Sequence, residues 1–180
     1  ADVWSHPGDF LLDGSLGAPP DDFSAEGQDW GLPAYNWEAL DSGGLGFLRR
    51  RATYARDLFD SYRIDHVVGL FRQWIWHGAL PNKSGSFCPV EEPDQLARGL
   101  AVLRAIQASS APTEVIAEDL GVIPPFVRDS LRMLGIPGYR VLPWEKENGR
   151  LRDCTRFATT SLATWSTHDT APITAWFDEL

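Results

Sequence analysis

The stretch YRIDHVV at residues 62–68 combines aromatic and β-branched residues, which favour an extended strand. Arg63 and Asp65 are two positions apart in it, and residues two apart on a strand project from the same face. Helical patterns flank the stretch, and a strand between helices is normally covered on both faces, where a charge is costly unless it is paired. The sequence therefore predicts a buried strand with an Arg63–Asp65 ion pair, in which the cation favours the charged form of Asp65.

Further strands and helices are predicted on both sides of this stretch. The other strands are expected at residues 115–120 (VIAEDL), 139–144 (YRVLPW) and 161–166 (SLATWS). Apolar residues at helical spacing predict helices at residues 45–60 and after Pro93, Pro124 and Pro172. Residues 5–44 and 77–93, which lack this periodicity, are predicted to be irregular. Strands that alternate with helices indicate βαβ units and a parallel sheet, so the chain is expected to be of the α/β class.

Two α/β architectures agree with this order of elements: an open doubly wound sheet and a (β/α)8 barrel of the TIM type. No Gly-rich phosphate loop follows any predicted strand, which argues against the nucleotide-binding form of the open sheet. Asp65, Glu118 and Asp169 lie toward the carboxyl ends of three predicted strands, which is where barrel enzymes build their active sites. The barrel is therefore favoured.

The surroundings of these carboxyl groups differ in a way that predicts different roles. Glu118 follows three apolar residues, so burial without an obvious cation should raise its pKa and keep it protonated, as a general acid requires. Asp65, held in its charged form, suits a nucleophile. Such a pair is typical of sugar-transferring enzymes with an oxocarbenium-like transition state, and Asp169 would add a third negative contact. The alternative for Glu118 and for Asp119 is capping of a following helix, which suits Asp119 better.

The amino-acid composition argues against some classes of binding partner and indicates the cellular compartment. A net charge of −9 and a pI near 4.8 argue against nucleic acid and an anionic membrane surface. The cysteines, Cys88 and Cys154, have no metal-ligand spacing, and their small number favours a reducing, cytoplasmic compartment. The eight tryptophans serve either as core anchors or as platforms for flat ligands such as sugar rings, and composition alone favours the core.

Three motifs carry a resemblance to a known family. YRIDH (62–66), VIAEDLG (115–121) and STHDT (166–170) resemble, in this order, the catalytic segments of the amylomaltases, the 4-α-glucanotransferases of glycoside hydrolase family 77. GAPPDDFSAEGQDWGLPAYNW (17–37) is similar to the long substrate loop of that family, and LGIPGYRVLPWE (134–145) to the segment between its second and third catalytic motifs. The resemblance covers essentially the whole chain.

The resemblance implies a role for each matching residue. Asp65 stands at the position of the nucleophile that forms a covalent glucosyl intermediate, Glu118 at that of the general acid/base, and Asp169 at that of the transition-state stabiliser. The implied substrate-binding residues are Arg63, His66, His168 and, on the acceptor side, Gln28, Trp30, Gly31 and Pro33. The implied reaction transfers segments of α-1,4-glucan between maltooligosaccharides with net retention, and it uses no metal or organic cofactor.

The resemblance also implies an incomplete barrel of the α-amylase superfamily. Family members are longer, so residues 1–180 are expected to be one partial catalytic domain that covers about strands four to seven. In it, residues 1–44 would form the substrate-loop region and residues 45–180 the strand–helix units with the catalytic carboxylates. The remaining barrel segments would be partners of this one, and the isolated segment is expected to be inactive because open sheet edges and apolar faces are exposed.

Two other functions stay open at this point. An amylase-like hydrolase would use the same carboxylates but pass the intermediate to water instead of a sugar. A glucan-binding module without catalysis would use only the tryptophans.

Overall fold

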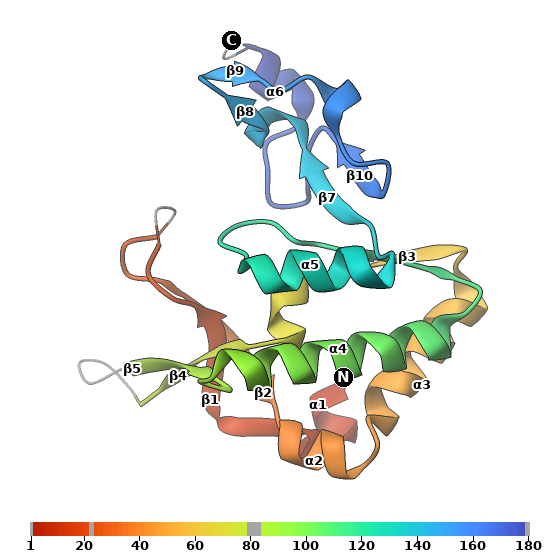
Figure 1. Cartoon of the computed structure of the whole chain (residues 1–180). Helices are drawn as coiled ribbons and strands as arrows, with labels where there is room; N and C mark the ends of the chain where they lie inside the picture. The colour runs from red at the N-terminus through yellow and green to blue at the C-terminus, as the bar shows by residue number, and fades with distance from the viewer. Residues whose placement is uncertain (1, 22–23, 79–83, 179–180) are drawn as a thin grey trace. The chain divides into compact units, whose positions relative to one another are not determined.

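The computed structural model describes residues 2–21, 24–78 and 84–178, and it divides into two compact units. The first unit comprises residues 1–62 and 67–114, and the second comprises residues 63–66 and 115–180 (Figure 1). Both units mix helices and strands, as the α/β prediction expects. In the described part of the chain, no helix combines the length and apolar character needed to cross a membrane.

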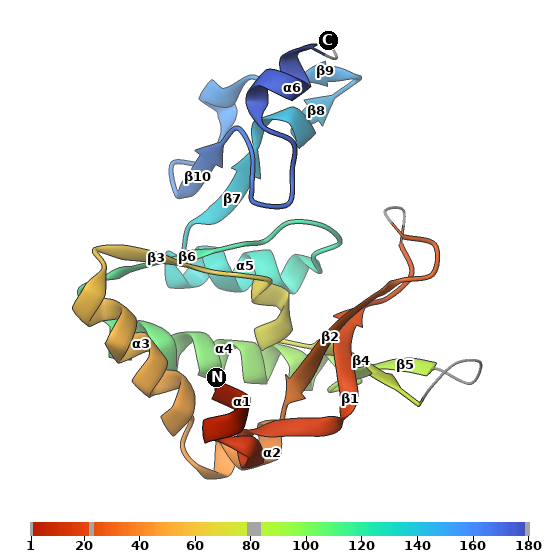
Figure 2. The ribbon, with the colours of Figure 1, turned by 180° about the vertical axis from the view of Figure 1, so that it is seen from behind.

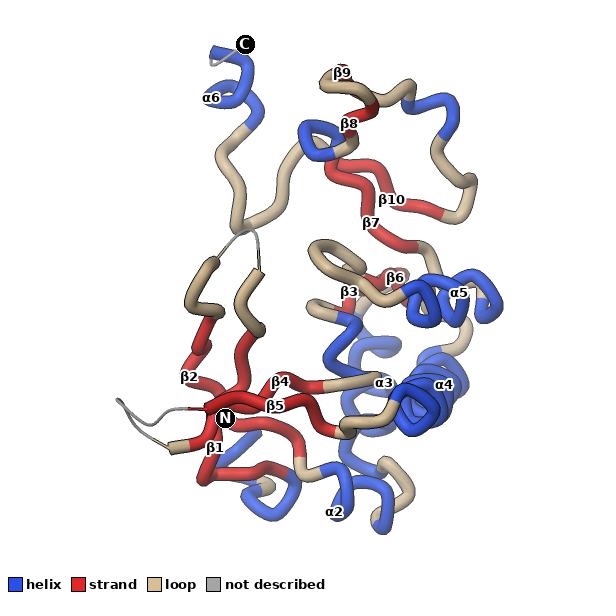
Figure 3. The backbone as a smooth tube through the Cα atoms, turned by 60° about the vertical axis from the view of Figure 1, so that its left-hand side comes forward, coloured by secondary structure: helices blue, strands red, loops and turns tan. Residues whose placement is uncertain are grey.

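A four-stranded antiparallel sheet belongs to the first unit (Figure 3). Its strand order is β2-β1-β4-β5, with β1 at Phe10–Ala18, β2 at Gln28–Tyr35, β4 at Gln73–His77 and β5 at Ser84–Cys88. Aromatic side chains connect these strands: Trp74 lies opposite Phe87 with ring centroids 4.8 Å apart, and Trp76 Nε1 donates to the Gln28 carbonyl at 2.7 Å. A ring pair between β4 and β5 and a tryptophan hydrogen bond from β4 to β2 therefore help to hold the sheet together.

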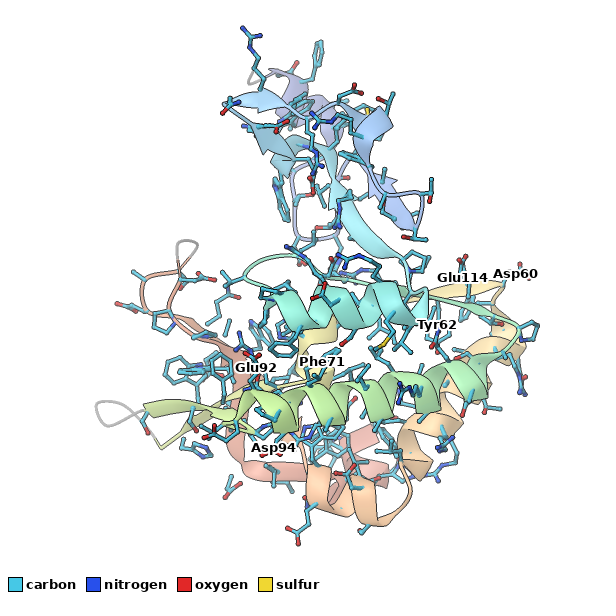
Figure 4. The ribbon with its side chains drawn as sticks, viewed as in Figure 1. Asp60, Tyr62, Phe71, Glu92, Asp94 and Glu114 are labelled. Atoms are coloured by element: carbon cyan, nitrogen blue, oxygen red, sulfur yellow. The ribbon has the colours of Figure 1, made fainter. Side chains whose placement is uncertain are left out.

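The helices of the first unit are α1 (Asp2–Ser5), α2 (Trp37–Ser42), α3 (Gly46–Leu58) and α4 (Glu92–Ser110), with 3-10 turns at Pro7–Asp9 and Val67–Leu70. The long helices α3 and α4 lie side by side (Figures 1 and 2). Phe71, labelled in Figure 4, is fully buried, and its ring lies so close to α4 that a Cβ at Gly99 would be 2.0 Å from it. Only glycine at this point of α4 admits the ring.

A short strand pair joins β3 (Ser61–Ile64) to β6 (Glu114–Ala117). At its amino end the Glu114 N–H donates to the Asp60 carbonyl at 3.1 Å, and Figure 4 shows these two residues next to each other.

At its carboxyl end the Glu118 N–H donates to the Ile64 carbonyl at 2.9 Å, so the pairing advances in the same direction along both strands and is parallel. Each strand ends one residue before a predicted catalytic carboxylate, Asp65 or Glu118.

The second unit continues with α5 (Pro125–Leu134), β7 (Gly138–Val141), β10 (Ser161–Thr164) and α6 (Ile173–Asp178), a hairpin of β8 (Lys146–Glu147) and β9 (Arg150–Leu151), and 3-10 turns at Leu142–Trp144 and Cys154–Arg156. Strands β7 and β10 are parallel neighbours. Val127 and Leu131 of α5 are buried at helical spacing, and Gly135 is the C-cap of this helix, both as predicted. The strand and helix predictions after residue 93 are therefore confirmed, with shorter strands.

Two predictions made for the rest of the chain are wrong. The strand predicted over residues 62–68 ends at Ile64, because His66 has a φ of 46° and Val67–Leu70 form a buried 3-10 turn. Residues 5–44 and 77–93 are not irregular where the structure describes them, since they contain β1, β2, α2, the end of β4, and β5. Residues 22–23 and 79–83 of these stretches lie outside the described part.

Candidate active site

Arg63 lies between two of the three predicted catalytic carboxyl groups. One of its guanidinium nitrogens is 2.6 Å from Asp65 Oδ1 and 3.9 Å from Glu118 Oε2. The Asp65 side chain is 65% exposed, contrary to the buried ion pair expected from the sequence. Exposed ion pairs contribute only about 0–1 kcal/mol to stability, so this contact adds little to the stability of the fold. Its main effect is to place a positive charge beside the Asp65 carboxylate.

Glu118 has a very different environment from Asp65, since its side chain is only 11% exposed. Its two oxygens accept separate backbone hydrogen bonds of 2.7 Å, Oε2 from the His66 N–H and Oε1 from the Leu120 N–H. Burial raises the pKa of Glu118 above its ordinary value of 4.5, and the two backbone donors and Arg63 offset only part of this effect. The raised pKa predicted from the sequence is confirmed in direction.

The backbone at His66 turns sharply to make one of these bonds. Its φ of 46° is in the left-handed region, which costs energy for a residue other than glycine. This conformation ends β3 and presents the His66 N–H to Glu118. Strained backbone of this kind gathers at functional sites, where the surrounding structure holds it.

The ring of Tyr139 contacts Arg63, and Tyr139 was not singled out as a site residue in the sequence. The guanidinium carbon of Arg63 lies 5.2 Å from the centroid of the Tyr139 ring, a cation–π contact. Tyr139 is on β7 and Arg63 on β3, so the contact connects the two strand pairs. An aromatic residue in a predicted strand is too common to be a signal by itself.

Asp169 and His168 lie in a turn between β10 and α6. His168 Nε2 is 3.2 Å from Asp169 Oδ2, and both side chains are largely exposed. The Asp169 N–H donates to Thr167 Oγ1 at 3.2 Å, which organises the turn. Asp65 and Glu118 share Arg63 as a partner, whereas within the described residues no shared partner links Asp169 to either of them.

The sequence places these motifs in a known family. The family model described as 4-alpha-glucanotransferase, glycoside hydrolase family 77, matches residues 1–180. The chain belongs to this family.

Other members of the 4-alpha-glucanotransferase family are similar over nearly the whole chain. The enzyme so named from Chlamydia caviae is 36% identical over 179 residues, 98% of this chain and 33% of the relative. Its counterpart from Thermus thermophilus is 37% identical over 155 residues, 83% of this chain and 30% of the relative. This chain thus spans about one third of the length of these relatives.

Solved structures of amylomaltases have the same fold over this segment. The Streptococcus agalactiae amylomaltase in complex with acarbose matches 99% of this chain and 37% of its own, with a TM-score of 0.79 at 28% identity. The Corynebacterium glutamicum amylomaltase matches 98% of this chain and 25% of its own, also with a TM-score of 0.79, at 26% identity.

The predicted acceptor-side residues of this 4-alpha-glucanotransferase family member lie on β2 in the first unit: Gln28, Trp30, Gly31 and Pro33. Trp30 Nε1 donates to Gln28 Oε1 at 2.9 Å, and Gly31 has a φ of 65°, which favours glycine. The carboxylates and Arg63 lie in the second unit, so the two groups of predicted residues belong to different units.

Asp119 does not cap a helix, because α5 begins only at Pro125. Its buried side chain instead accepts a hydrogen bond from the Tyr139 N–H and lies near Arg128 and Arg140. The capping interpretation is therefore wrong for this residue. Across the described residues, no group of three or more His, Cys, Asp and Glu side chains is arranged to hold a metal ion.

Proposed function

We propose that this chain carries the catalytic centre of a 4-α-glucanotransferase that transfers segments of α-1,4-glucan between maltooligosaccharides. Membership of the family and the contrast between Asp65 and Glu118 support this activity. We propose further that residues 1–180 are one part of a (β/α)8 barrel, about strands four to seven, with residues 1–44 as the substrate region. The remaining barrel would come from other segments of a full-length protein, which the one-third coverage of the relatives supports.

The proposed reaction is a double displacement that starts with Asp65. Its carboxylate attacks the anomeric carbon of the donor while Glu118 gives its proton to the departing glycosidic oxygen, so one C–O bond forms as another breaks. The 4-hydroxyl of an acceptor glucan then attacks the glucosyl ester, and Glu118 takes up the hydroxyl proton. Asp65 leaves as a carboxylate, and two inversions give net retention. No cofactor enters either step.

Arg63 supports the retaining form of this reaction because a single guanidinium nitrogen is within reach of both carboxyl groups. Such proximity favours the short separation, about 5–5.5 Å, of retaining enzymes over the wider one that leaves room for water in inverting enzymes. The cation also stabilises the charge of Asp65 before attack and when it leaves.

The other residues have proposed roles around the sugar. Asp169 would stabilise positive charge at the anomeric carbon, and His66 and His168 would bind hydroxyl groups of the donor glucose. Gln28, Trp30, Gly31 and Pro33 would line the acceptor side. Their family positions support these assignments, and the two free cysteines support a reducing compartment, which we propose is the cytoplasm.

The observation that carries the proposal is the pairing of an exposed, Arg63-bound Asp65 with a buried Glu118 of raised pKa. Incubating the full-length protein with maltotriose tests it. Chromatography is expected to show glucose together with chains longer than maltotriose. Shortening alone would indicate an amylase-like hydrolase, and unchanged maltotriose would indicate a glucan-binding module.

The raised pKa of Glu118 predicts the pH dependence of the first step. A general acid works only while protonated, so kcat/KM for maltotriose should fall as the pH rises through this pKa. Because burial raises the pKa of Glu118, this fall should begin above its ordinary value of 4.5. A pH series checks it with α-maltosyl fluoride as the comparison donor: fluoride leaves without a proton from Glu118, so its kcat/KM should lack this decline.

A further inference from the structure

A buried carboxylate directly follows Glu118 and has no role in the proposed reaction. The Asp119 side chain is 2% exposed. Its Oδ1 accepts a 2.7 Å hydrogen bond from the Tyr139 N–H, and Oδ2 is 3.4 Å from both Arg128 Nε and a terminal nitrogen of Arg140. Burying a carboxyl group is costly unless it is hydrogen-bonded and paired, so these partners together account for its position.

The contact between Asp119 and β7 is also sterically close. A Cβ added to Gly138 would lie 2.7 Å from Asp119 Oδ1 and 2.9 Å from Oδ2, so the carboxylate rests directly on the backbone. Beside it, the Ala117 N–H donates to the Pro137 carbonyl at 2.8 Å. Residues 117–119 are therefore attached to residues 137–139 through both backbone and side chain, with little freedom to shift.

This attachment leads to Glu118 by two routes. Asp119 directly follows Glu118 in the chain, so anchoring the Asp119 side chain restricts the backbone from which the Glu118 side chain projects. Tyr139, whose N–H binds Asp119, places its ring against Arg63, and Arg63 lies 3.9 Å from Glu118. The contacts of Asp119 thus fix the position of the Glu118 backbone and, through Tyr139, the position of Arg63, the cation next to Glu118.

We propose that Asp119 is a positioning residue that holds the Glu118 carboxyl group in the orientation needed for proton transfer. The inference rests on the proposed function, since it assigns no chemistry to Asp119 itself and only deepens the role of Glu118. Proton transfer requires hydrogen-bond geometry, and a displacement of about 1 Å from a distant change costs on the order of 100-fold in rate.

Two variants of the full-length protein test the inference from opposite sides. Asp119→Asn replaces one acceptor oxygen by an NH2 donor, although the partners of this side chain, the Tyr139 N–H, Arg128 and Arg140, can only donate. Gly138→Ala leaves the Asp119 carboxylate intact, but the added Cβ pushes its oxygens away from β7. If Asp119→Asn does not fold, Gly138→Ala alone tests the inference. In both, kcat/KM for maltotriose is expected to fall about 100-fold, whereas kcat/KM for α-maltosyl fluoride should fall far less, because its leaving group needs no proton.

Asp129→Asn is the matched control, because Asp129 is 66% exposed on α5 and pairs only at the surface with Arg132 at 2.7 Å. It should leave both rates unchanged. Equal losses for the two donors would show a general structural role and overturn the inference, as would unchanged maltotriose kinetics in folded Gly138→Ala. A parent protein that turns over neither donor would contradict the proposed function itself, which separates the two failures.

Discussion

Asp65→Asn in the full-length protein is expected to lower kcat for maltotriose by about 10⁴-fold or more, because an amide cannot form the glucosyl ester on which both steps depend. The change is nearly isosteric and lies at a side chain that is 65% exposed, so neither packing nor stability should suffer. Arg63 keeps its second neighbour, Glu118, at 3.9 Å. The glucose and longer maltooligosaccharides released over time measure the effect.

Binding separates loss of the nucleophile from loss of the site. The variant should bind maltooligosaccharides about as tightly as the parent does, measured by calorimetry, while mass spectrometry finds no covalent glucosyl adduct. Asp57→Asn is the matched control, since Asp57 is 59% exposed on α3 and pairs with Arg56, as Asp65 pairs with Arg63. Turnover by Asp65→Asn at the parent rate would contradict the proposed role of Asp65 as the nucleophile.

Glu118→Gln is expected to lower kcat for maltotriose by about 10²–10⁴-fold, which is the rate enhancement that general acid–base catalysis usually contributes. The structure predicts an additional effect, because both Glu118 oxygens accept backbone hydrogen bonds, from His66 and Leu120. The amide nitrogen of glutamine would face one of these donors and lose that bond. Glutamine should therefore sit differently from glutamate at this position, despite its similar shape.

Donors with different leaving groups resolve the two roles of Glu118. With α-maltosyl fluoride the first step should stay fast, so the covalent intermediate on Asp65 should accumulate and be detectable by mass spectrometry. Azide, which attacks without base catalysis, should release it as a glycosyl azide. Glu147→Gln is the control, because Glu147 is a 57% exposed partner of Arg156. An intermediate that fails to accumulate would contradict the acid/base assignment.

The parts of the fold that were predictable are those with local signals. Apolar periodicity identified α3, α4 and α5, and Gly135 marked the end of α5. The antiparallel sheet was missed because its order, β2-β1-β4-β5, depends on pairing between segments far apart in sequence. One signal existed in β4, where Gln73, Ile75 and His77 alternate with Trp74 and Trp76.

The site was predictable to the same degree. Two-residue spacing identified the Arg63–Asp65 pair, although Asp65 lies beyond the end of its strand, and apolar neighbours predicted the raised pKa of Glu118. The role of Asp119 depends on Tyr139 and Arg140, about twenty residues further along the chain, and no local pattern encodes such contacts.

The backbone hydrogen bonds to Glu118 have a consequence for protein engineering. Every amino acid except proline supplies an N–H, so substitutions at His66 or Leu120 that keep the turn leave these donors in place. Directed evolution of the acid strength, for example toward another working pH, would therefore have to act on burial or on the distance to Arg63. The left-handed turn at His66 narrows the choice there further, since β-branched residues tolerate it poorly.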